Sequence, residues 1–201
     1  MLLQGGCGVD GDANRGYRFF VETITANGVD DTTETFSPIG GAELDIRDCG
    51  QVDTVAGGTT TTTLFKNRQA TFNFVVDVVN GFNYAAGTGL DVRLVTLIRS
   101  YEVVQGVNVQ LPEQRVDFGD NGPVIDVDDN DRAELGVVVP FFTSEQAQDY
   151  DNQVLGINGG TDYRAEIRFV YQFYAQDNFG ENVSATVSFP VQVSDYRDEC
   201  N

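Results

Sequence analysis

The sequence contains no histidine and no tryptophan, and these two absences narrow the functions open to the chain. Without histidine, Ser-His-Asp and Cys-His catalysis and the usual zinc ligand sets are excluded. Without tryptophan, the strongest aromatic platform for stacking sugars or cations is missing. No pair of carboxylates stands out as a glycosidase site among 31 acidic residues. The sequence therefore predicts a protein that is not an enzyme.

Basic residues are also scarce. Lys and Arg number 12 against 31 Asp and Glu, so the formal net charge is −19, and Lys66 is the only lysine. A nucleic-acid partner requires a basic surface, so nucleic acid is excluded, and an anionic membrane surface is disfavoured for the same reason. No run of about 20 apolar residues is present to span a membrane.

Three cysteines carry information about the compartment. Cys49 and Cys200 both follow acidic residues, which disfavour a reactive thiolate. We expect these two residues to form a disulfide that ties down the C-terminus by closing a loop of about 150 residues. Such a bond indicates an oxidising, extracytoplasmic compartment. Three free thiols in a cytoplasmic protein are the alternative.

The third cysteine, Cys7, lies in the N-terminal stretch MLLQGGCG. Six preceding residues are too few for a signal peptide. Residues 2–7 nevertheless resemble the lipobox of secreted lipoproteins, although Gln4 stands where that family usually has an apolar residue. The resemblance implies lipidation of Cys7 and a lipid anchor, with residues 1–16 as an N-terminal arm or leader remnant. An ordinary N-terminus with a chance cysteine is the alternative.

Alternation of apolar and polar residues is the dominant pattern along the chain and predicts β-strands. Residues 165–173 and 183–193 alternate strictly, and the turn-forming residues between them predict a hairpin. Pro190 has no N–H to donate, so the last strand is expected at a sheet edge there. Further strands are expected at residues 17–26, 42–47, 70–79, 90–104, 115–118 and 133–142. The threonine-rich residues 59–65 are expected to form a strand or an extended linker.

One short helix is expected over SEQAQDYD, residues 144–151, with Thr143 and Gln146 forming a capping box. Regularly spaced strands with hardly any helix predict an all-β fold. We expect a single immunoglobulin-like β-sandwich of about ten strands over residues 17–201, with an N-terminal elaboration.

The terminal hairpin carries a second resemblance. The stretch YRAEIRFVYQFYAQDNFGENVSATVSFPVQVSD, with its Asp177-Asn178-Phe179-Gly180 turn, resembles the last two strands of bacterial and archaeal immunoglobulin-like or fibronectin-like domains. By analogy of fold alone, the resemblance implies a surface or adhesive role. Asn182-Val183-Ser184 forms a glycosylation sequon at this turn.

The segment VIDVDDNDRAEL, residues 124–135, has a dense group of acidic residues. Asp126, Asp128 and Asn130 have the alternate spacing that turns oxygen ligands toward one calcium ion, and Glu134 is placed to add a carboxylate. The run DVDDN resembles the DxNDN motif of cadherin linkers, with Asp128 in place of Asn. We therefore hypothesise a calcium site in this segment.

The same alternate spacing recurs at Asp10, Asp12 and Asn14. The alternative for both segments is a solvated acidic turn. Asp131 stands where the helical calcium loop requires glycine, and Val137, at its twelfth position, cannot chelate.

These observations favour a non-enzymatic, extracytoplasmic structural or adhesive protein of the cell surface, whose partners are other surface proteins or copies of itself. One alternative is a subunit of an extracellular filament or surface assembly, joined by strand addition through the final strand and the N-terminal arm. Another is a carbohydrate-binding module that stacks sugars on tyrosines. Its candidate stacking residues are Tyr84, Tyr101, Tyr150 and Tyr174.

Overall fold

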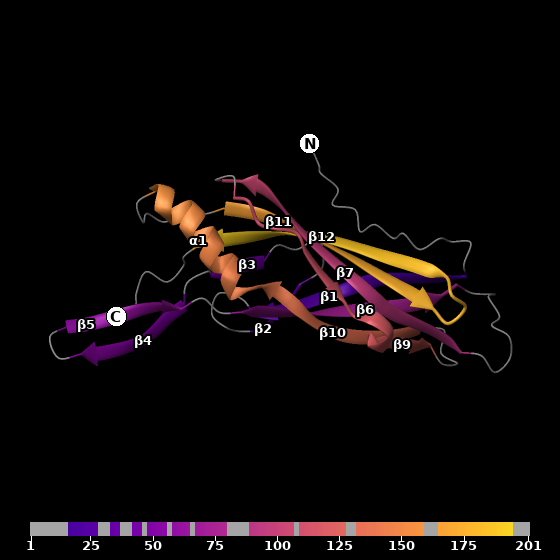
Figure 1. Cartoon of the computed structure of the whole chain (residues 1–201). Coiled ribbons are helices and arrows are strands. Elements are labelled where there is room, and N and C mark those ends of the chain that lie inside the picture. The colour runs from indigo at the N-terminus through magenta and orange to yellow at the C-terminus, as the bar shows by residue number, and fades with distance from the viewer. Residues whose placement is uncertain are drawn as a thin grey trace.

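The computed structural model shows an elongated β-structure in which two sheets pack face to face (Figure 1). It describes residues 16–27, 33–36, 42–45, 48–55, 58–64, 67–79, 89–106, 109–127, 132–158 and 165–194. Side chains are described for these residues except 27–64, 155–158 and 194, where the backbone alone is described.

The first sheet has four antiparallel strands in the order β10-β6-β1-β2. Their bounds are Arg132–Phe142 for β10, Arg68–Val78 for β6, Tyr17–Asn27 for β1 and Thr33–Phe36 for β2. The chain passes between the two sheets several times, for example from β6 to β7, from β9 to β10 and from β10 to β11.

The second sheet has six strands in the order β3-β12-β11-β7, after which β8 and β9 both pair with β7. The bounds are Ala42–Asp45 for β3, Asn182–Ser194 for β12, Ala165–Asp177 for β11, Leu90–Gln105 for β7, Gln114–Asp117 for β8 and Val124–Val127 for β9. All its pairings are antiparallel except that of β3 with β12, which is parallel.

Aromatic side chains fill the space between the sheets. Every second residue of β11 is buried, as the alternation in the sequence requires. Tyr171 and Phe173 of β11 contact Phe72 of β6, with ring centroids 4.7 and 5.3 Å away. Phe169, Phe141 and Phe189 form a second stacked group. Each buried aromatic ring contributes on the order of 2 kcal/mol through apolar burial, so this layer dominates the stability of the sandwich.

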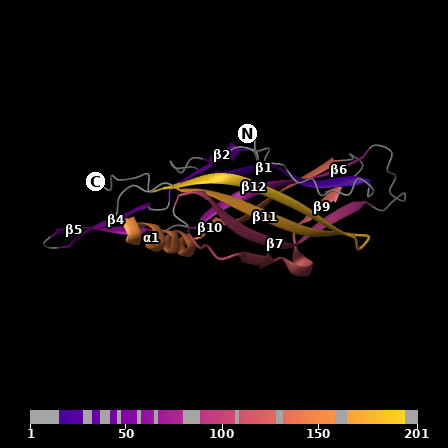
Figure 2. The same cartoon turned by 90° about the horizontal axis from the view of Figure 1, so that it is seen from above.

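A helix, α1 (Ser144–Asn158), covers one end of the sandwich (Figure 2). Its capping box is confirmed, because Gln146 N donates to Thr143 Oγ1 (3.2 Å) and Thr143 N donates to Gln146 Oε1 (3.0 Å). Ala147, Tyr150 and Val154 lie on one face of the helix and are buried. The helix is longer than expected from sequence because this apolar stripe extends beyond residue 151. No helix among the described residues is long and apolar enough to cross a membrane.

The all-β fold class is confirmed by the two packed sheets. The predicted terminal hairpin is confirmed by the antiparallel pairing of β11 with β12. The described residues form twelve strands rather than about ten. The sequence prediction missed β2, β9 and β4 (Asp48–Val55). Two of these are four-residue strands, too short to show a period, and β9 lies in the segment interpreted as a calcium loop. The predicted N-terminal arm lies outside the described residues, apart from Gly16.

The connection from β8 to β9 lies tightly against β7. It contains a short 3-10 helix, η2 (Gly119–Asn121), and is held by hydrogen bonds from Phe118 N to Val95 O (2.8 Å) and from Leu94 N to Pro123 O (2.9 Å). A Cβ at Gly122 would lie 1.8 Å from the carbonyl oxygen of Leu94, so only glycine fits this close approach.

We predict that Gly122→Ala displaces this connection and lowers the free energy of unfolding by more than about 2 kcal/mol, because backbone atoms rather than a flexible side chain must move. Chemical denaturation measures the change. Gly89→Ala is the matched control, since its Cβ would meet no described atom closer than 3.6 Å. Equal stability of the two variants would contradict the close approach of Gly122 to Leu94.

Candidate functional site

The acidic segment that predicted a calcium site begins in a regular strand. Asp126 is exposed in β9 and lies directly opposite Asp91 of β7. Like charges placed opposite each other on neighbouring strands destabilise a sheet unless something neutralises them. Neither carboxylate forms an ion pair within the described part of the chain, and no group of three metal-binding side chains occurs there.

Of the remaining predicted ligands, the structure describes only Glu134. Asp128, Asn130, Asp10, Asp12 and Asn14 lie outside the described residues. Glu134 lies on β10, where its carboxylate forms an ion pair with Arg132. The calcium site therefore stays a prediction, with Asp91 as a further candidate ligand that sequence reasoning missed because it is distant in the chain.

The predicted modification sites are only partly placed. Cys49 lies in β4, but its side chain, Cys7 and Cys200 are outside the described residues, so the disulfide and the lipidation stay predictions. Asn182 begins β12 with an exposed side chain, next to the turn where the sequon was expected.

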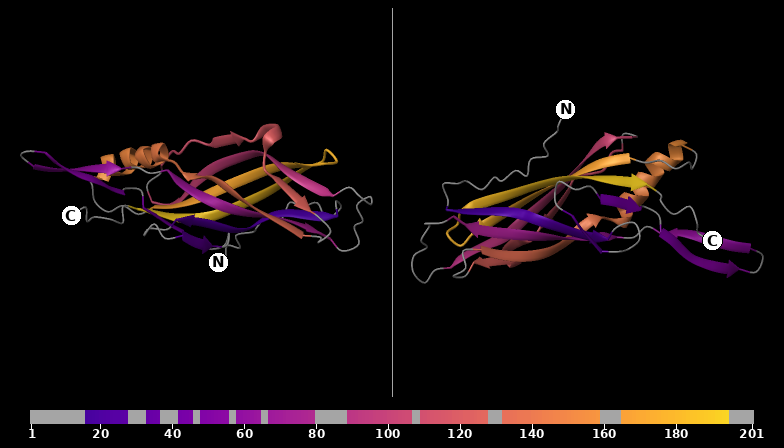
Figure 3. Two further views of the ribbon diagram at one scale, coloured as in Figure 1. Left: turned by 90° about the horizontal axis from the view of Figure 1, so that it is seen from below. Right: turned by 180° about the vertical axis from the view of Figure 1, so that it is seen from behind.

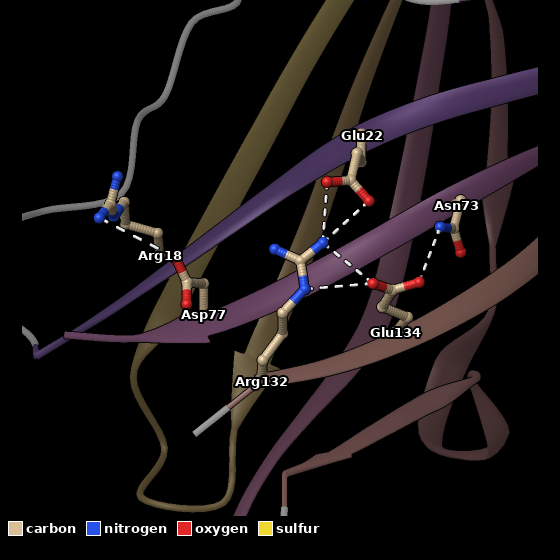
Figure 4. Close-up of polar contacts among 6 residues, drawn as sticks. All are labelled: Arg18, Glu22, Asn73, Asp77, Arg132 and Glu134. Atoms are coloured by element: carbon tan, nitrogen blue, oxygen red, sulfur yellow. Dashed lines mark hydrogen bonds and ion pairs between the residues drawn. The ribbon is translucent and has the colours of Figure 1, made fainter. Parts of the chain in front are cut away.

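The outer face of the four-stranded sheet carries a charged network (Figure 4). Arg132 Nη2 donates to both carboxylate oxygens of Glu22, at 2.8 and 2.9 Å, and also to Glu134 Oε1 at 2.9 Å. Asn73 Nδ2 donates to the other oxygen of Glu134 (3.3 Å). Hydrogen bonds from Arg132 and Asn73 lower the pKa of Glu134, and those to Glu22 and Glu134 raise the pKa of Arg132.

This network spans three neighbouring strands of the sheet. Arg132 is on β10 and Glu22 is on β1, so the arginine side chain crosses β6, which lies between them (Figure 4). Val75 points to the same outer face of β6 and is fully buried, although it does not belong to the core between the sheets. The exposed ion pairs add little energy themselves, and the arginine reduces the repulsion between the two carboxylates.

A polar cluster is buried between the sheets near α1. Arg99 of β7 is 3% exposed, donates through Nη1 to the carbonyl oxygen of Pro140, and lies 5.8 Å from the centre of the Tyr101 ring. Tyr101 Oη accepts a hydrogen bond from Gln146 Nε2 (2.7 Å). Tyr171 Oη donates to Phe141 O (3.3 Å). The cluster links β7, β10, β11 and α1, and sequence reasoning missed it because arginine in an alternating strand normally faces water.

Burial raises the pKa of both tyrosines in this cluster, with that of Tyr171 the more strongly raised. Tyr150, one of the tyrosines considered for sugar stacking, is fully buried, and Tyr101 is largely covered. Among the tyrosines that the structure describes, Tyr174 alone is exposed. Tyr84 lies outside the described residues, so of the four candidate stacking tyrosines the structure shows only Tyr174 as exposed.

One edge of the six-stranded sheet is only partly covered. β3 pairs with Val191–Ser194, the last four of the 13 residues of β12, and no described strand pairs with the rest of that edge. Pro190 lies where β3 pairing ends, as expected for a residue that cannot donate. Open strand edges normally pair with other chains unless charges or prolines block them.

The two strands β4 and β5 (Gly58–Leu64) form a separate sheet that projects beyond the end of the sandwich (Figures 1 and 3). Each strand pairs only with the other among the described strands, so one backbone edge of each is unpaired. The sequence predicted a strand or linker in the threonine-rich stretch but not its partner β4, whose glycine and aspartates obscure the pattern.

Comparisons with known proteins add nothing to these observations. No protein-family model matches the sequence, and no curated protein or solved structure matches the chain. Function is therefore inferred from the residues and the geometry of this chain.

The buried tyrosine predicts a specific dependence of stability on pH. The folded-state pKa of Tyr171 is raised, so its contribution to stability is complete below about pH 10, the ordinary tyrosine pKa, and is lost as the pH rises above that value. We predict that Tyr171→Phe loses less stability between about pH 9 and 11 than the wild type. Denaturant unfolding across this range measures the difference.

Tyr174→Phe is the matched control, since Tyr174 lies on the same strand with an exposed ring. It should follow the wild-type pH profile. An unchanged profile in Tyr171→Phe would contradict the assignment of alkaline instability to this residue.

For the acidic segment, we predict that calcium raises the melting temperature more than magnesium at equal ionic strength, because magnesium requires a stricter octahedral site. Asp128→Ala should abolish the difference between the two ions. Asp149→Ala removes the same charge from an exposed position of α1 and should leave it intact. Identical melting with calcium, magnesium and chelator would show that the segment is only a charged turn.

Proposed function

We propose that this protein is a non-catalytic structural or adhesive β-sandwich of the extracytoplasmic cell surface, and that it joins neighbouring molecules by pairing strands. The observation that carries the proposal is the β4–β5 hairpin, which stands outside the sandwich and whose outer edges pair with no described strand. An isolated two-stranded hairpin is marginally stable in water, so a partner that pairs with it would stabilise it.

The sandwich itself suits a load-bearing or spacing module. Its aromatic layer runs from the Phe19–Phe74 stack to the Phe141–Phe189 stack, and a capped helix covers one end. The other end, at the β11–β12 turn, is held by Tyr17, whose hydroxyl donates to Asp177 Oδ2 (3.0 Å) across the two sheets. Long antiparallel strands fixed at both ends resist local opening, a property that a structural subunit requires.

The extracytoplasmic location rests on sequence features. They are the expected Cys49–Cys200 disulfide, the lipobox resemblance at Cys7 and the sequon at Asn182. A lipid on Cys7 would hold the protein at a membrane surface, whereas strand pairing would join it to other surface proteins or to copies of itself.

Net charge sets the conditions for assembly. A charge of −19 opposes close association of identical molecules at low ionic strength. At about 1 M salt the screening length falls to about 3 Å, and short-range main-chain pairing then outweighs repulsion.

We predict that the wild-type protein is monomeric at low salt and self-associates as sodium chloride rises toward about 1 M, because screening removes the repulsion. Sedimentation velocity measures the change in mass. Sucrose, which does not screen charge, is the control and should leave the protein monomeric. A monomer at every salt concentration, with calcium also present, would overturn the proposed assembly.

A further inference from the structure

The hydrogen-bond pattern shows which groups the open edge of β12 offers. Asp177 N donates to Glu181 O (2.9 Å), so these residues form a hydrogen-bonded pair at the turn. Such pairs alternate along an antiparallel ladder. The pairs Tyr174–Ser184 and Gln172–Thr186 are therefore non-hydrogen-bonded pairs. The N–H groups of Ser184, Thr186 and Ser188 accordingly point away from β11.

This edge lacks the usual protection against pairing. From residue 182 to 194 the sequence contains no charged residue, although about one residue in five of the chain is charged. Natural edge strands are normally blocked by charges, bulges or proline, and here Pro190 blocks only the end next to β3. No described strand pairs with the part before Pro190, and this part carries no charge.

The β4–β5 hairpin has matching properties. Residues 54–65 carry no charge, and Thr59–Thr63 are five consecutive β-branched residues with high strand propensity. β5 has seven residues, and nine residues of β12 are left uncovered by β3. β4 contains Asp48 and Asp53, which would place charge against the acidic surface of a second molecule. Strand β5 is therefore the better partner of the two.

The two features lie at opposite ends of the long axis. The hairpin projects from one end, and the β11–β12 turn, from which the open edge starts, is at the other (Figures 1 and 3). A molecule cannot bring its own hairpin to that edge, whereas the next molecule along the axis can. A contact between two different surfaces of identical subunits is heterologous, and it propagates when the rotation does not close a ring.

We propose that β5 of one molecule docks on the open edge of β12 in a second copy, beside residues 184–188, and that the repeated contact joins molecules head to tail. The inference rests on the proposed function and names the partner and the two surfaces that meet. Main-chain hydrogen bonds supply the affinity, as in other cases of strand addition.

Two proline variants test the two surfaces separately. Thr186→Pro removes an N–H that faces the open edge and leaves the ladder with β11 intact, as Pro190 already does four residues further on. Thr61→Pro disrupts β5, which is outside the sandwich. Each variant should keep the wild-type melting temperature and weaken self-association at about 1 M salt by more than about tenfold, as the loss of at least one hydrogen bond requires.

Thr186→Val and Thr61→Val are the matched controls, since valine keeps the backbone N–H and the strand propensity. Both should associate as the wild type does. Thr186→Glu keeps the N–H but adds charge to the edge, and it replaces Thr186→Pro as the test if the proline variant does not fold.

Mixing the two proline variants gives the decisive result. Thr186→Pro retains an intact hairpin and Thr61→Pro retains an intact edge, so a one-to-one mixture should form heterodimers that stop growing. The docking assignment would be overturned if Thr61→Pro self-associated as strongly as the wild type, or if the mixture stayed monomeric. A wild-type protein that never associates would instead overturn the proposed function.

Discussion

The structure depends on one continuous layer of aromatic side chains between two sheets. Phe72, Phe74, Tyr171 and Phe173 form its centre. Phe72 makes tilted contacts with Tyr171 and Phe173, and Phe74 meets Phe173 edge-on. Because strand side chains alternate, burying this layer fixes the register of each strand that contributes to it. The outer faces are then free to carry the polar and charged residues that give the chain its acidity.

A sandwich built in this way leaves edges. Main-chain groups at an edge need water or another strand, and the chain deals with its edges unequally. β3 and Pro190 close the end of β12, whereas the stretch before Pro190 and both outer edges of the β4–β5 hairpin have no described partner strand. The lack of charge in β5 and in the stretch before Pro190, within a chain of net charge −19, is what favours pairing at these two places over non-specific association elsewhere.

The parts of the fold predicted from sequence are those governed by local rules. The alternation in residues 165–173 and 183–193 predicted β11 and β12, and Thr143 with Gln146 predicted the start of α1. Short strands such as β2 and β9 were missed because four residues show no period. The burial of Arg99, the Asp91–Asp126 pair and the isolation of β4–β5 depend on residues far apart in the chain. Local patterns do not contain that information.

The central claim is that molecules join through specific strand edges, and amide hydrogen exchange of the wild-type protein tests it most directly. Exchange read by mass spectrometry at low and at high salt reports which backbone amides become protected on association. Strand pairing predicts new protection of residues 58–64 and 184–188, with the buried strands β6 and β11 unchanged. Protection that appears elsewhere, with these two segments exchanging as fast as in the monomer, would contradict it.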